Sequence, residues 1–267
     1  MENRIKAIIK LSGNTLGYEN TTPNEGNIDQ KKVDEYAENI FELYRRGFNP
    51  FTIVGGSNIA NGEKLVESGE STNKIKADLI GMEATHINVK AIYEVLKEMD
   101  CPVTMISMLG KNEDFVPFNL SKLIEFSEMK ETICLIAGGT GFAGFTTDTA
   151  AAIFAYNIGM DKIIKATSAG ALYNQDPRDL TKKETLKKIH IATYSSVIER
   201  DLNVMDLTAI AYSKRNNMDV FITGSEDADN MERILKHGEN PEGSLITSQD
   251  KVLKLIRSDI EKIGILV

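Results

Sequence analysis

Short apolar runs alternate with longer amphipathic segments along most of the chain. The apolar runs cover residues 5–11, 51–54, 103–108, 133–137, 162–166, 220–223 and 244–247. Segments with apolar residues three and four positions apart cover residues 29–47, 74–99, 147–158, 206–215, 227–237 and 250–263. This alternation is typical of βαβ units, so we expect an α/β fold, a three-layer α/β/α sandwich around a mostly parallel central sheet.

The 267 residues suit one large domain or two tightly joined lobes. No repeat, low-complexity segment or clear linker divides the sequence. We expect one continuous α/β domain in which residues 1–160 and 161–248 form two lobes. Residues 249–267 are expected to add a C-terminal helix.

Charge and cysteine content exclude several classes of function. Lysine and arginine total 31 against 39 aspartate and glutamate, a net charge of −8, so nucleic acid is not an expected partner. No apolar run approaches the roughly 20 residues that span a membrane. Cys101 and Cys134 lack a CxxC or Cys/His pattern, which predicts two reduced, buried thiols and no protein-bound metal. We therefore expect a cytoplasmic protein.

Three predicted strands end in glycine-rich turns, at residues 10–13, 55–58 and 138–141. In a parallel sheet such turns meet at the carboxyl edge, where ligands bind. Glycine lets backbone amides approach an anion closely, and a following helix adds its positive N-terminal end. Three such turns in one chain indicate a site that holds several phosphates.

The third turn also matches G-x-G-x-x-G over residues 139–144, after a strand and before a helix. A dinucleotide site would require an acidic residue about 20 positions later, at the end of the next strand. That strand ends at residues 166–168 without a carboxylate, and Asp161 precedes it. The sequence therefore disfavours an NAD site.

Two lysines lie within apolar strands that end at the same predicted edge, Lys10 and Lys165. One such lysine could simply extend from an edge strand into solvent, because a buried ammonium without a partner is costly. Two of them, with Asp148 opening the helix after the third glycine turn, form a coherent set. Asp148 could orient both ammonium groups, and Thr146 and Thr147 could bind an anion. The chain has no Walker A loop, so these lysines would have to meet the phosphate charge.

At these residues the chain resembles the bacterial uridylate (UMP) kinases of the amino acid kinase superfamily, from about residue 6 to residue 247. The resemblance rests on ordered matches at residues 9–13, 55–58, 77–78, 81–82, 84–85, 87–88, 139–141, 145–148, 165–167, 173, 176–177 and 204–209. It implies an amino acid kinase-like fold and a Mg²⁺-ATP-dependent conversion of UMP to UDP, a step of pyrimidine biosynthesis. It also implies a homohexamer.

The resemblance implies roles for individual residues. Lys10, Asp148 and Lys165 match the catalytic positions, where the two lysines stabilise the transferring phosphoryl group and the aspartate organises them. The ATP positions, in the 161–248 lobe and the first turn, are matched by Lys10, Ser12, Gly13, Thr167, Tyr173 and Asp176. The acceptor positions, in the 1–160 lobe, are matched by Gly55, Gly56, Asn61, Asp78, Thr140, Gly141, Phe142 and Thr147. Asp78 would take the ribose hydroxyls.

Several positions depart from the family pattern. Ser57 replaces a glycine, and Asn61 replaces an arginine that meets the acceptor phosphate in relatives, so a charge-assisted contact is lost. Phe142 replaces an asparagine that lies near the base. Residues 168–171 depart from the usual Lys-Val-Asp-Gly. The transfer machinery is thus kept better than the acceptor pocket.

Three functions follow. The leading one is phosphorylation of UMP by ATP through direct in-line transfer. Asn61 and Phe142 suggest the alternative of a kinase with another small phosphate or carboxylate acceptor. A nucleotide-binding or storage protein without turnover is the third, although binding alone would not require Lys10, Asp148 and Lys165 together.

Overall fold

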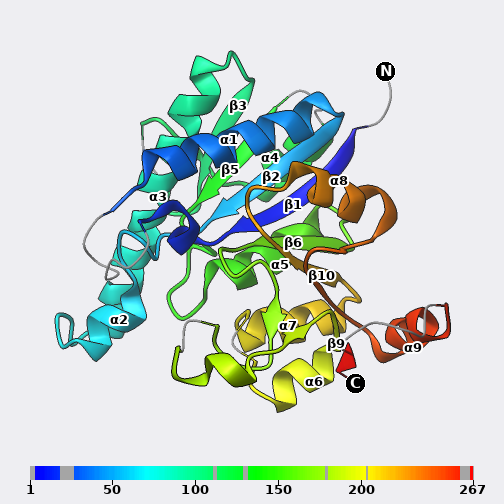
Figure 1. Cartoon of the computed structure of the whole chain (residues 1–267). Coiled ribbons are helices and arrows are strands. Elements are labelled where there is room, and N and C mark those ends of the chain that lie inside the picture. Colours follow the sequence, from blue (N-terminus) through cyan, green and yellow to red (C-terminus); the bar gives the residue numbers. More distant parts are fainter. Residues whose placement is uncertain are drawn as a thin grey trace.

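A ten-stranded sheet forms the centre of the computed structural model, in the order β12-β9-β11-β10-β6-β1-β2-β5-β3-β4 (Figure 1). The strands from β10 to β4 are mutually parallel, β11 pairs antiparallel with β10, and β9 and β12 follow the direction of β11. The structure describes residues 4–18, 27–110, 113–128, 132–177, 180–202, 204–258 and 265–266.

The sheet strands are β1 (Ile5–Leu11), β2 (Phe48–Val54), β3 (Val103–Ser107), β4 (Val116–Pro117), β5 (Ile133–Ala137), β6 (Lys162–Ala166), β9 (Ile191–Thr193), β10 (Asp219–Thr223), β11 (Ser244–Thr247) and β12 (Ile265–Leu266). The helices are α1 (Gln30–Arg45), α2 (Gly62–Glu67), α3 (Lys74–Glu98), α4 (Leu120–Glu128), α5 (Thr147–Asn157), α6 (Tyr194–Glu199), α7 (Leu207–Arg215), α8 (Ala228–His237) and α9 (Gln249–Ser258). Two short 3₁₀ segments, η1 (Gly13–Leu16) and η2 (Leu180–Thr185), and a small antiparallel sheet of β7 (Leu172–Tyr173) and β8 (Lys188–Ile189) complete the described elements.

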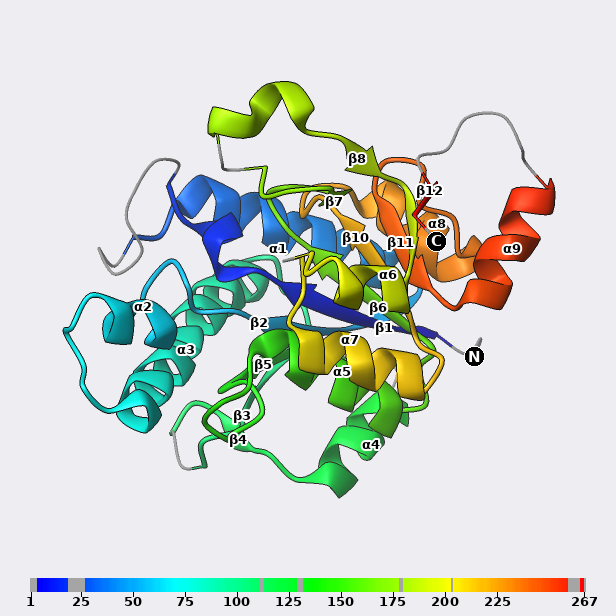
Figure 2. The ribbon, with the colours of Figure 1, turned by 90° about the horizontal axis from the view of Figure 1, so that it is seen from below.

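Helices cover both faces of the sheet, which confirms the expected three-layer α/β/α sandwich. Figure 2 shows α1 and α8 on one side of β1 and β6, and α4, α5 and α7 on the other. One core cluster joins α1, α3 and α8 to the sheet, and a second joins α4, α5, α6 and α7 to its other face. The central strands are therefore buried on both sides, which explains their almost continuous apolar sequences.

The predicted strands and long helices are found, with differences at their ends. β2 begins at Phe48 rather than at residue 51, because residues 48–50 already pair with residues 5–7 of β1. Pro50 is tolerated there because β5, the neighbour on the other side, pairs only from Phe51 onward. The predicted C-terminal helix is present as α9, which ends at Ser258, and residues 259–264 lie outside the described residues. The prediction of helix was wrong for residues 265–266, because these two apolar residues pair with β9 as the strand β12. The short elements α2, α4, α6 and β9 have no counterpart among the predictions.

β1 and β6 are neighbours, so the sheet continues across the predicted lobe boundary near residue 160. Their register pairs Lys10 directly with Lys165. Directly opposed residues of paired strands project from the same face of a sheet, so both lysine side chains point toward the same side. The carboxyl ends of β1, β2, β5 and β6 also bring the three glycine turns to one edge.

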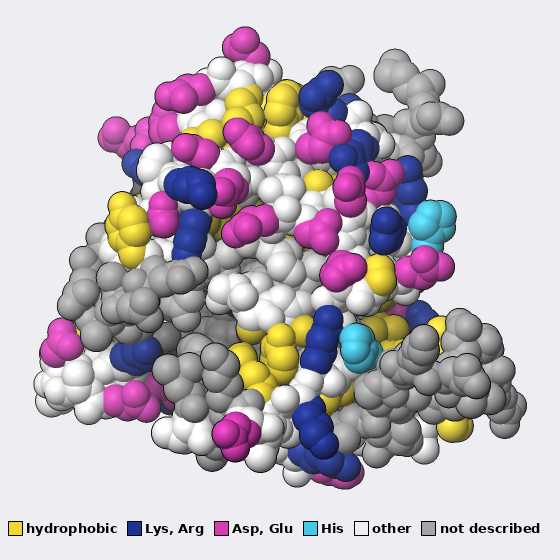
Figure 3. All heavy atoms as spheres, viewed as in Figure 1, with side chains coloured by type: hydrophobic (Ala, Val, Ile, Leu, Met, Phe, Trp, Pro, Cys, Tyr) yellow, Lys and Arg dark blue, Asp and Glu magenta, His cyan; other side chains and the backbone are white. Residues whose placement is uncertain are grey.

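Charged side chains of both signs are mixed on the face that α1 and α8 cover (Figure 3). Arg46 at the end of α1 lies 2.6 Å from Asp229 and 2.6 Å from Glu232 of α8, and these contacts join the two helices. Within the described residues, no helix is long and apolar enough to cross a membrane.

Core packing around β10 gives a test of the fold. Phe221 is fully buried in this strand, whereas Phe142 is 72% exposed on the loop before α5. We expect Phe221→Ala to lower the free energy of unfolding by about 3–5 kcal/mol, because it leaves a cavity between sheet and helices. Phe142→Ala is the matched control and should change it by less than about 0.5 kcal/mol. Urea unfolding curves measure both values, and similar losses for the two variants would contradict this packing.

Candidate active site

A buried carboxylate lies between two buried ammonium groups at the carboxyl edge of the sheet. Asp148 Oδ2 accepts a hydrogen bond from Lys165 Nζ at 2.6 Å, and its Oδ1 lies 3.0 Å from Lys10 Nζ. Lys10 Nζ also donates to Ser12 Oγ at 3.1 Å. All three charged residues are at most 7% exposed. The structure thus brings together the three residues that the sequence predicts as catalytic.

Burial and charge act in opposite directions on this triad. Burial disfavours ionisation of the Asp148 carboxyl, but the charges of Lys10 and Lys165 outweigh it and hold its pKa below the ordinary value. Burial lowers the pKa of Lys165 to about 8, and the positive charge of Lys10 lowers it further, although the Asp148 carboxylate acts to raise it. The triad carries one net positive charge when both lysines are protonated, which favours binding of an anion.

The first turn of α5 places Asp148. Thr146 caps this helix, its Oγ1 accepting from the Asp148 amide at 3.0 Å. Its hydroxyl in turn donates to Asp206, the N-cap residue of α7, which also accepts from Thr149 Oγ1 at 2.9 Å and from the Ala209 amide at 2.8 Å. Asp206 therefore fixes the start of α5 to the start of α7. Sequence reasoning assigned it no role, because its partners lie 57 and 60 positions away.

The first two glycine turns pack backbone against backbone. A Cβ atom on Gly13 would lie 2.5 Å from the Ser57 nitrogen, and one on Gly55 would lie 2.8 Å from the Gly13 nitrogen. The Gly55 amide donates to the Leu11 carbonyl at 2.8 Å. Only glycine permits this approach, which leaves the backbone of both turns at the wall of the site.

Two buried asparagines anchor the second glycine turn through hydrogen bonds. Asn88 of α3 donates to the Gly55 carbonyl at 2.7 Å and exchanges side-chain hydrogen bonds with Asn58 at 2.6 and 3.0 Å. Asn58 also donates to the Asn27 carbonyl at 3.0 Å. The resemblance matches both asparagines but gives them no role, and the structure shows that they anchor the turn.

A cleft of about 430 Å³ opens above Lys10 and Asp148. Five of the predicted acceptor residues line it: Gly55, Gly56, Asn61, Asp78 and Thr147. Gly13, predicted for ATP, lines it as well. Asp78 Oδ2 accepts from the Gly144 amide at 2.8 Å, so the third glycine turn is joined to α3 across the cleft.

The other predicted acceptor residues lie outside the lining of this cleft. The Thr140 hydroxyl is engaged within its own turn, donating to the Phe142 carbonyl at 3.2 Å and accepting from the Phe142 amide at 3.1 Å. Gly141 is in the left-handed region with φ of 77° against the Met108 carbonyl, and the Phe142 ring projects outward. Roles for these three residues in nucleotide binding stay predictions.

The residues predicted for ATP are divided between two places. Ser12 follows β1 beside Lys10, and the Thr167 amide donates to the Thr223 carbonyl at 3.0 Å at the end of β6. Tyr173 and Asp176 line a second cleft of about 310 Å³, which Arg200 and Leu202 also border. The structure thus brings Lys10, Ser12 and Lys165 together and places Tyr173 and Asp176 at a separate hollow.

Asn61 and Lys74 occupy the wall of the first cleft near α2 and α3. Asn61 caps α2, accepting from the Lys64 amide at 3.2 Å, which explains an asparagine at this position. Lys74 is the first residue of α3 and was not among the predicted site residues, because surface lysines at helix starts carry no distinctive pattern.

The triad predicts how the Lys165 pKa responds to its neighbours. Replacing Asp148 by Asn removes the carboxylate that most favours the charged form, so the pKa should fall from about 8 by roughly one unit or more. Asp161→Asn is the control, because Asp161 is an exposed aspartate just before β6 and should leave the pKa of Lys165 unchanged. NMR titration of the lysine side-chain carbon next to the amine measures both, and an unchanged pKa in Asp148→Asn would contradict this coupling.

Comparison with known proteins places the chain among phosphotransferases. The model of the amino acid kinase family matches residues 6–224. A uridylate kinase of Xanthomonas oryzae pv. oryzae is 32% identical over 88% of this chain and 93% of that protein, and one of Bacteroides thetaiotaomicron is 31% identical over 86% and 93%. The crystal structure of a UMP kinase from Bacillus anthracis superimposes with a TM-score of 0.79 at 23% identity, covering 93% of this chain and 98% of that one. The family and the fold predicted from the motifs are both confirmed.

Proposed function

Because the chain belongs to the amino acid kinase family, we propose that it transfers the γ-phosphoryl group of ATP to UMP, forming UDP and ADP. The observation that carries the proposal is the triad of Lys10, Asp148 and Lys165 beneath a cleft lined by glycines of all three turns. Binding of a nucleotide alone would not require two buried ammonium groups held by one carboxylate.

The reaction needs no general base from the protein. A phosphate oxygen of UMP is already ionised and attacks the γ-phosphorus in line, a new P–O bond forms, and the bond to the β-phosphate oxygen breaks as ADP leaves. Catalysis then rests on position and on neutralising the charge of the migrating group. Lys10 and Lys165 supply that charge, and Asp148 keeps both ammonium groups aimed at one point.

The two substrates would occupy opposite sides of the triad. We assign the acceptor to residues 1–160, where the cleft is lined by Gly55, Gly56, Asp78 and Thr147, with Asp78 available to the ribose hydroxyls. We assign ATP to residues 161–248, with its phosphates toward Ser12, Gly13 and Thr167 and its nucleoside toward the hollow at Tyr173 and Asp176. Thr140, Gly141 and Phe142 would approach the acceptor once it is bound.

Magnesium enters this proposal as part of the ATP substrate. Among the described residues, no group of three or more His, Cys, Asp or Glu side chains could hold a metal ion. Mg²⁺ in phosphoryl-transfer sites is commonly bound through one or two carboxylates together with substrate phosphates. An ion that arrives bound to ATP therefore does not require a cluster of protein ligands. The ion would add positive charge on the phosphates.

Rates with different acceptors test the proposal. We expect Mg²⁺-ATP and UMP to give UDP. Asp148→Asn should lower kcat by about 10²–10³-fold and change ATP affinity by less than about tenfold. The reason is that the variant leaves the two ammonium groups without their common partner, and their charges stabilise the transition state most. Asp161→Asn is the control, an exposed aspartate just before β6. A coupled ADP assay and calorimetry measure both quantities.

Equal losses of turnover and ATP affinity in Asp148→Asn would contradict its organising role. Turnover with a non-nucleotide acceptor alone, or ATP binding without turnover of any acceptor, would replace UMP phosphorylation by one of the two other functions.

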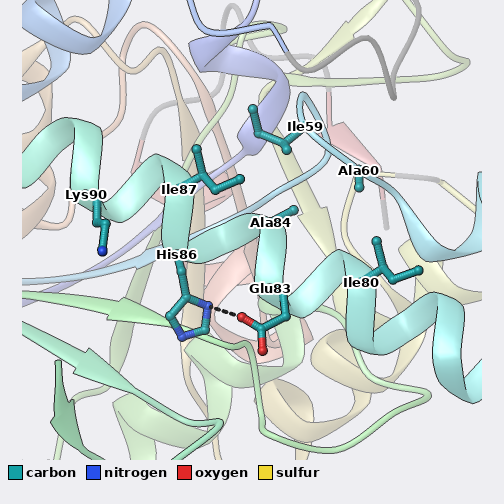
Figure 4. Close-up of a pocket in the computed structure, with 8 residues that line it drawn as sticks. All are labelled: Ile59, Ala60, Ile80, Glu83, Ala84, His86, Ile87 and Lys90. Atoms are coloured by element: carbon teal, nitrogen blue, oxygen red, sulfur yellow. Dashed lines mark ion pairs between the residues drawn. The ribbon is translucent and has the colours of Figure 1, made fainter. Parts of the chain in front are cut away.

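We also propose that the chain assembles into a homo-oligomer in the cytoplasm, as the resemblance to hexameric relatives implies. Support comes from α3, which exposes Ile80 and Ile87 by 49% each on one side. A groove of about 390 Å³ runs along this side, lined by Ile80, Glu83, Ala84, His86, Ile87 and Lys90 of the helix and by Ile59 and Ala60 of the facing loop (Figure 4). Exposed isoleucines with a few charged residues at their edge suit burial against a second copy. The free, buried thiols of Cys101 and Cys134 suit a reducing compartment.

The oligomer can be tested at this face. Placing a carboxylate there, in the double variant Ile80→Asp/Ile87→Asp, should lower the molar mass in solution, because a charge cannot be buried unpaired at an apolar contact. Ile124→Asp on α4, where the side chain is 38% exposed, is the control and should keep the mass of the unaltered protein. Light scattering on a sizing column measures the mass. An unchanged assembly in the double variant would exclude this face.

A further inference from the structure

The charged side chains at the acceptor cleft balance one another. Lys10, Lys74, Glu63, Asp78 and Asp148 line it, and Lys165 pairs with Asp148 beneath it. Three carboxylates and three ammonium groups leave no excess positive charge for a phosphate monoester, which carries close to two negative charges at neutral pH. A cation dedicated to the acceptor phosphate is therefore needed.

Lys10 is already engaged at the floor of the cleft. It lies 3.0 Å from Asp148 and donates to Ser12, and both contacts direct it toward the point of phosphoryl transfer. Lys74 is different, since within the described part of the chain its ammonium has no ion pair and no hydrogen bond. It is exposed, and the first turn of α3 contains no acidic residue; the next acidic residue along the helix, Asp78, accepts a hydrogen bond from the Gly144 amide at 2.8 Å.

Close packing of α2 on α3 sets Lys74 beside the acceptor wall. A Cβ atom on Gly62 would lie 2.8 Å from the Ala77 carbonyl oxygen and 2.8 Å from Asp78 Oδ1. The start of α2, with Asn61, therefore lies against the first turn of α3. Asn61 is uncharged, and its side-chain oxygen accepts from the Lys64 amide as the cap of α2. Lys74 is thus the cation on this wall.

We propose that Lys74 binds the phosphate of the acceptor and makes the site select nucleoside monophosphates over nucleosides. This inference rests on the proposed function and names the residue that meets the charge of its acceptor. Lys74 lies at the rim of the cleft, and Gly55 and Gly56 of the second glycine turn line the same cleft, so the flexible lysine side chain can extend toward a phosphate bound there. Lys10 and Lys165 then remain free to act on the group being transferred.

Three variants of the full chain test this. Lys74→Gln removes the charge, Lys74→Arg keeps it, and Lys76→Gln removes another exposed charge from the same helical turn outside the cleft. We expect Lys74→Gln to raise the KM for UMP about tenfold, with a smaller effect on kcat, as for loss of one charge-assisted contact. Lys74→Arg should restore most of the affinity, and Lys76→Gln should behave as the unaltered protein.

Binding of UMP and of uridine, measured by calorimetry, separates the phosphate contact from a general disturbance of the fold. Lys74→Gln should weaken UMP binding about tenfold and leave uridine binding unaltered, because uridine lacks the phosphate. If the unaltered protein forms UDP and Lys74→Gln does not change the KM for UMP, this inference fails and the proposed function stands. Equal weakening of UMP and uridine also overturns it. If the unaltered protein neither binds UMP nor forms UDP, both proposals fail.

Discussion

Two ammonium groups buried beside each other would destabilise this fold unless something held them. The register of β1 and β6 sets Lys10 directly opposite Lys165, at the roughly 4.8 Å spacing of hydrogen-bonded strands. Asp148 offsets their repulsion by presenting one carboxylate oxygen to each. The arrangement leaves one positive charge in a dry environment, where a migrating phosphoryl group feels it far more strongly than in water.

Much of the neighbouring structure serves to bring Asp148 within reach. α5 buries Ala150, Ala151, Ala152 and Ala155, whose small side chains let the helix axis lie close to the sheet. Its first turn is then fixed from the side by Asp206 through the hydroxyls of Thr146 and Thr149. A bulkier helix would hold the carboxylate farther from the strands, and a looser first turn would let it swing. The small alanine side chains and the capping network both hold the Asp148 carboxylate close to the two lysines.

The sequence predicted the parts of this protein that depend on local pattern. Strand periodicity and the rule that parallel strands end at one edge were enough to bring Lys10, Lys165 and the glycine turns together. The position of Asp148 followed from the helix that the third turn opens. Short elements such as α2 and α6 were missed because they span too few residues for a periodic signal, and Pro50 interrupts the apolar pattern in the first half of β2.

Other features depend on contacts that no local pattern encodes. Asn88 anchors a turn 33 residues away, and Asp206 accepts from threonines 57 and 60 residues away, so their roles become visible only in three dimensions. The third glycine turn is a similar case. Gly138, Gly139, Gly141 and Gly144 all have positive φ, so the path of the chain between them could not be deduced from the motif. That path turns Phe142 outward and keeps it off the cleft wall.

The pairing of β1 with β6 has a mechanical consequence. Lys10 and Lys165 belong to adjacent strands of one continuous ladder, so the separation of their backbones cannot change without breaking hydrogen bonds in the middle of the sheet. Any opening that admits substrates must occur in the turns and helices around this rigid seam. The chain thus keeps its electrostatic centre on the stiffest part of the molecule and leaves movement to the periphery.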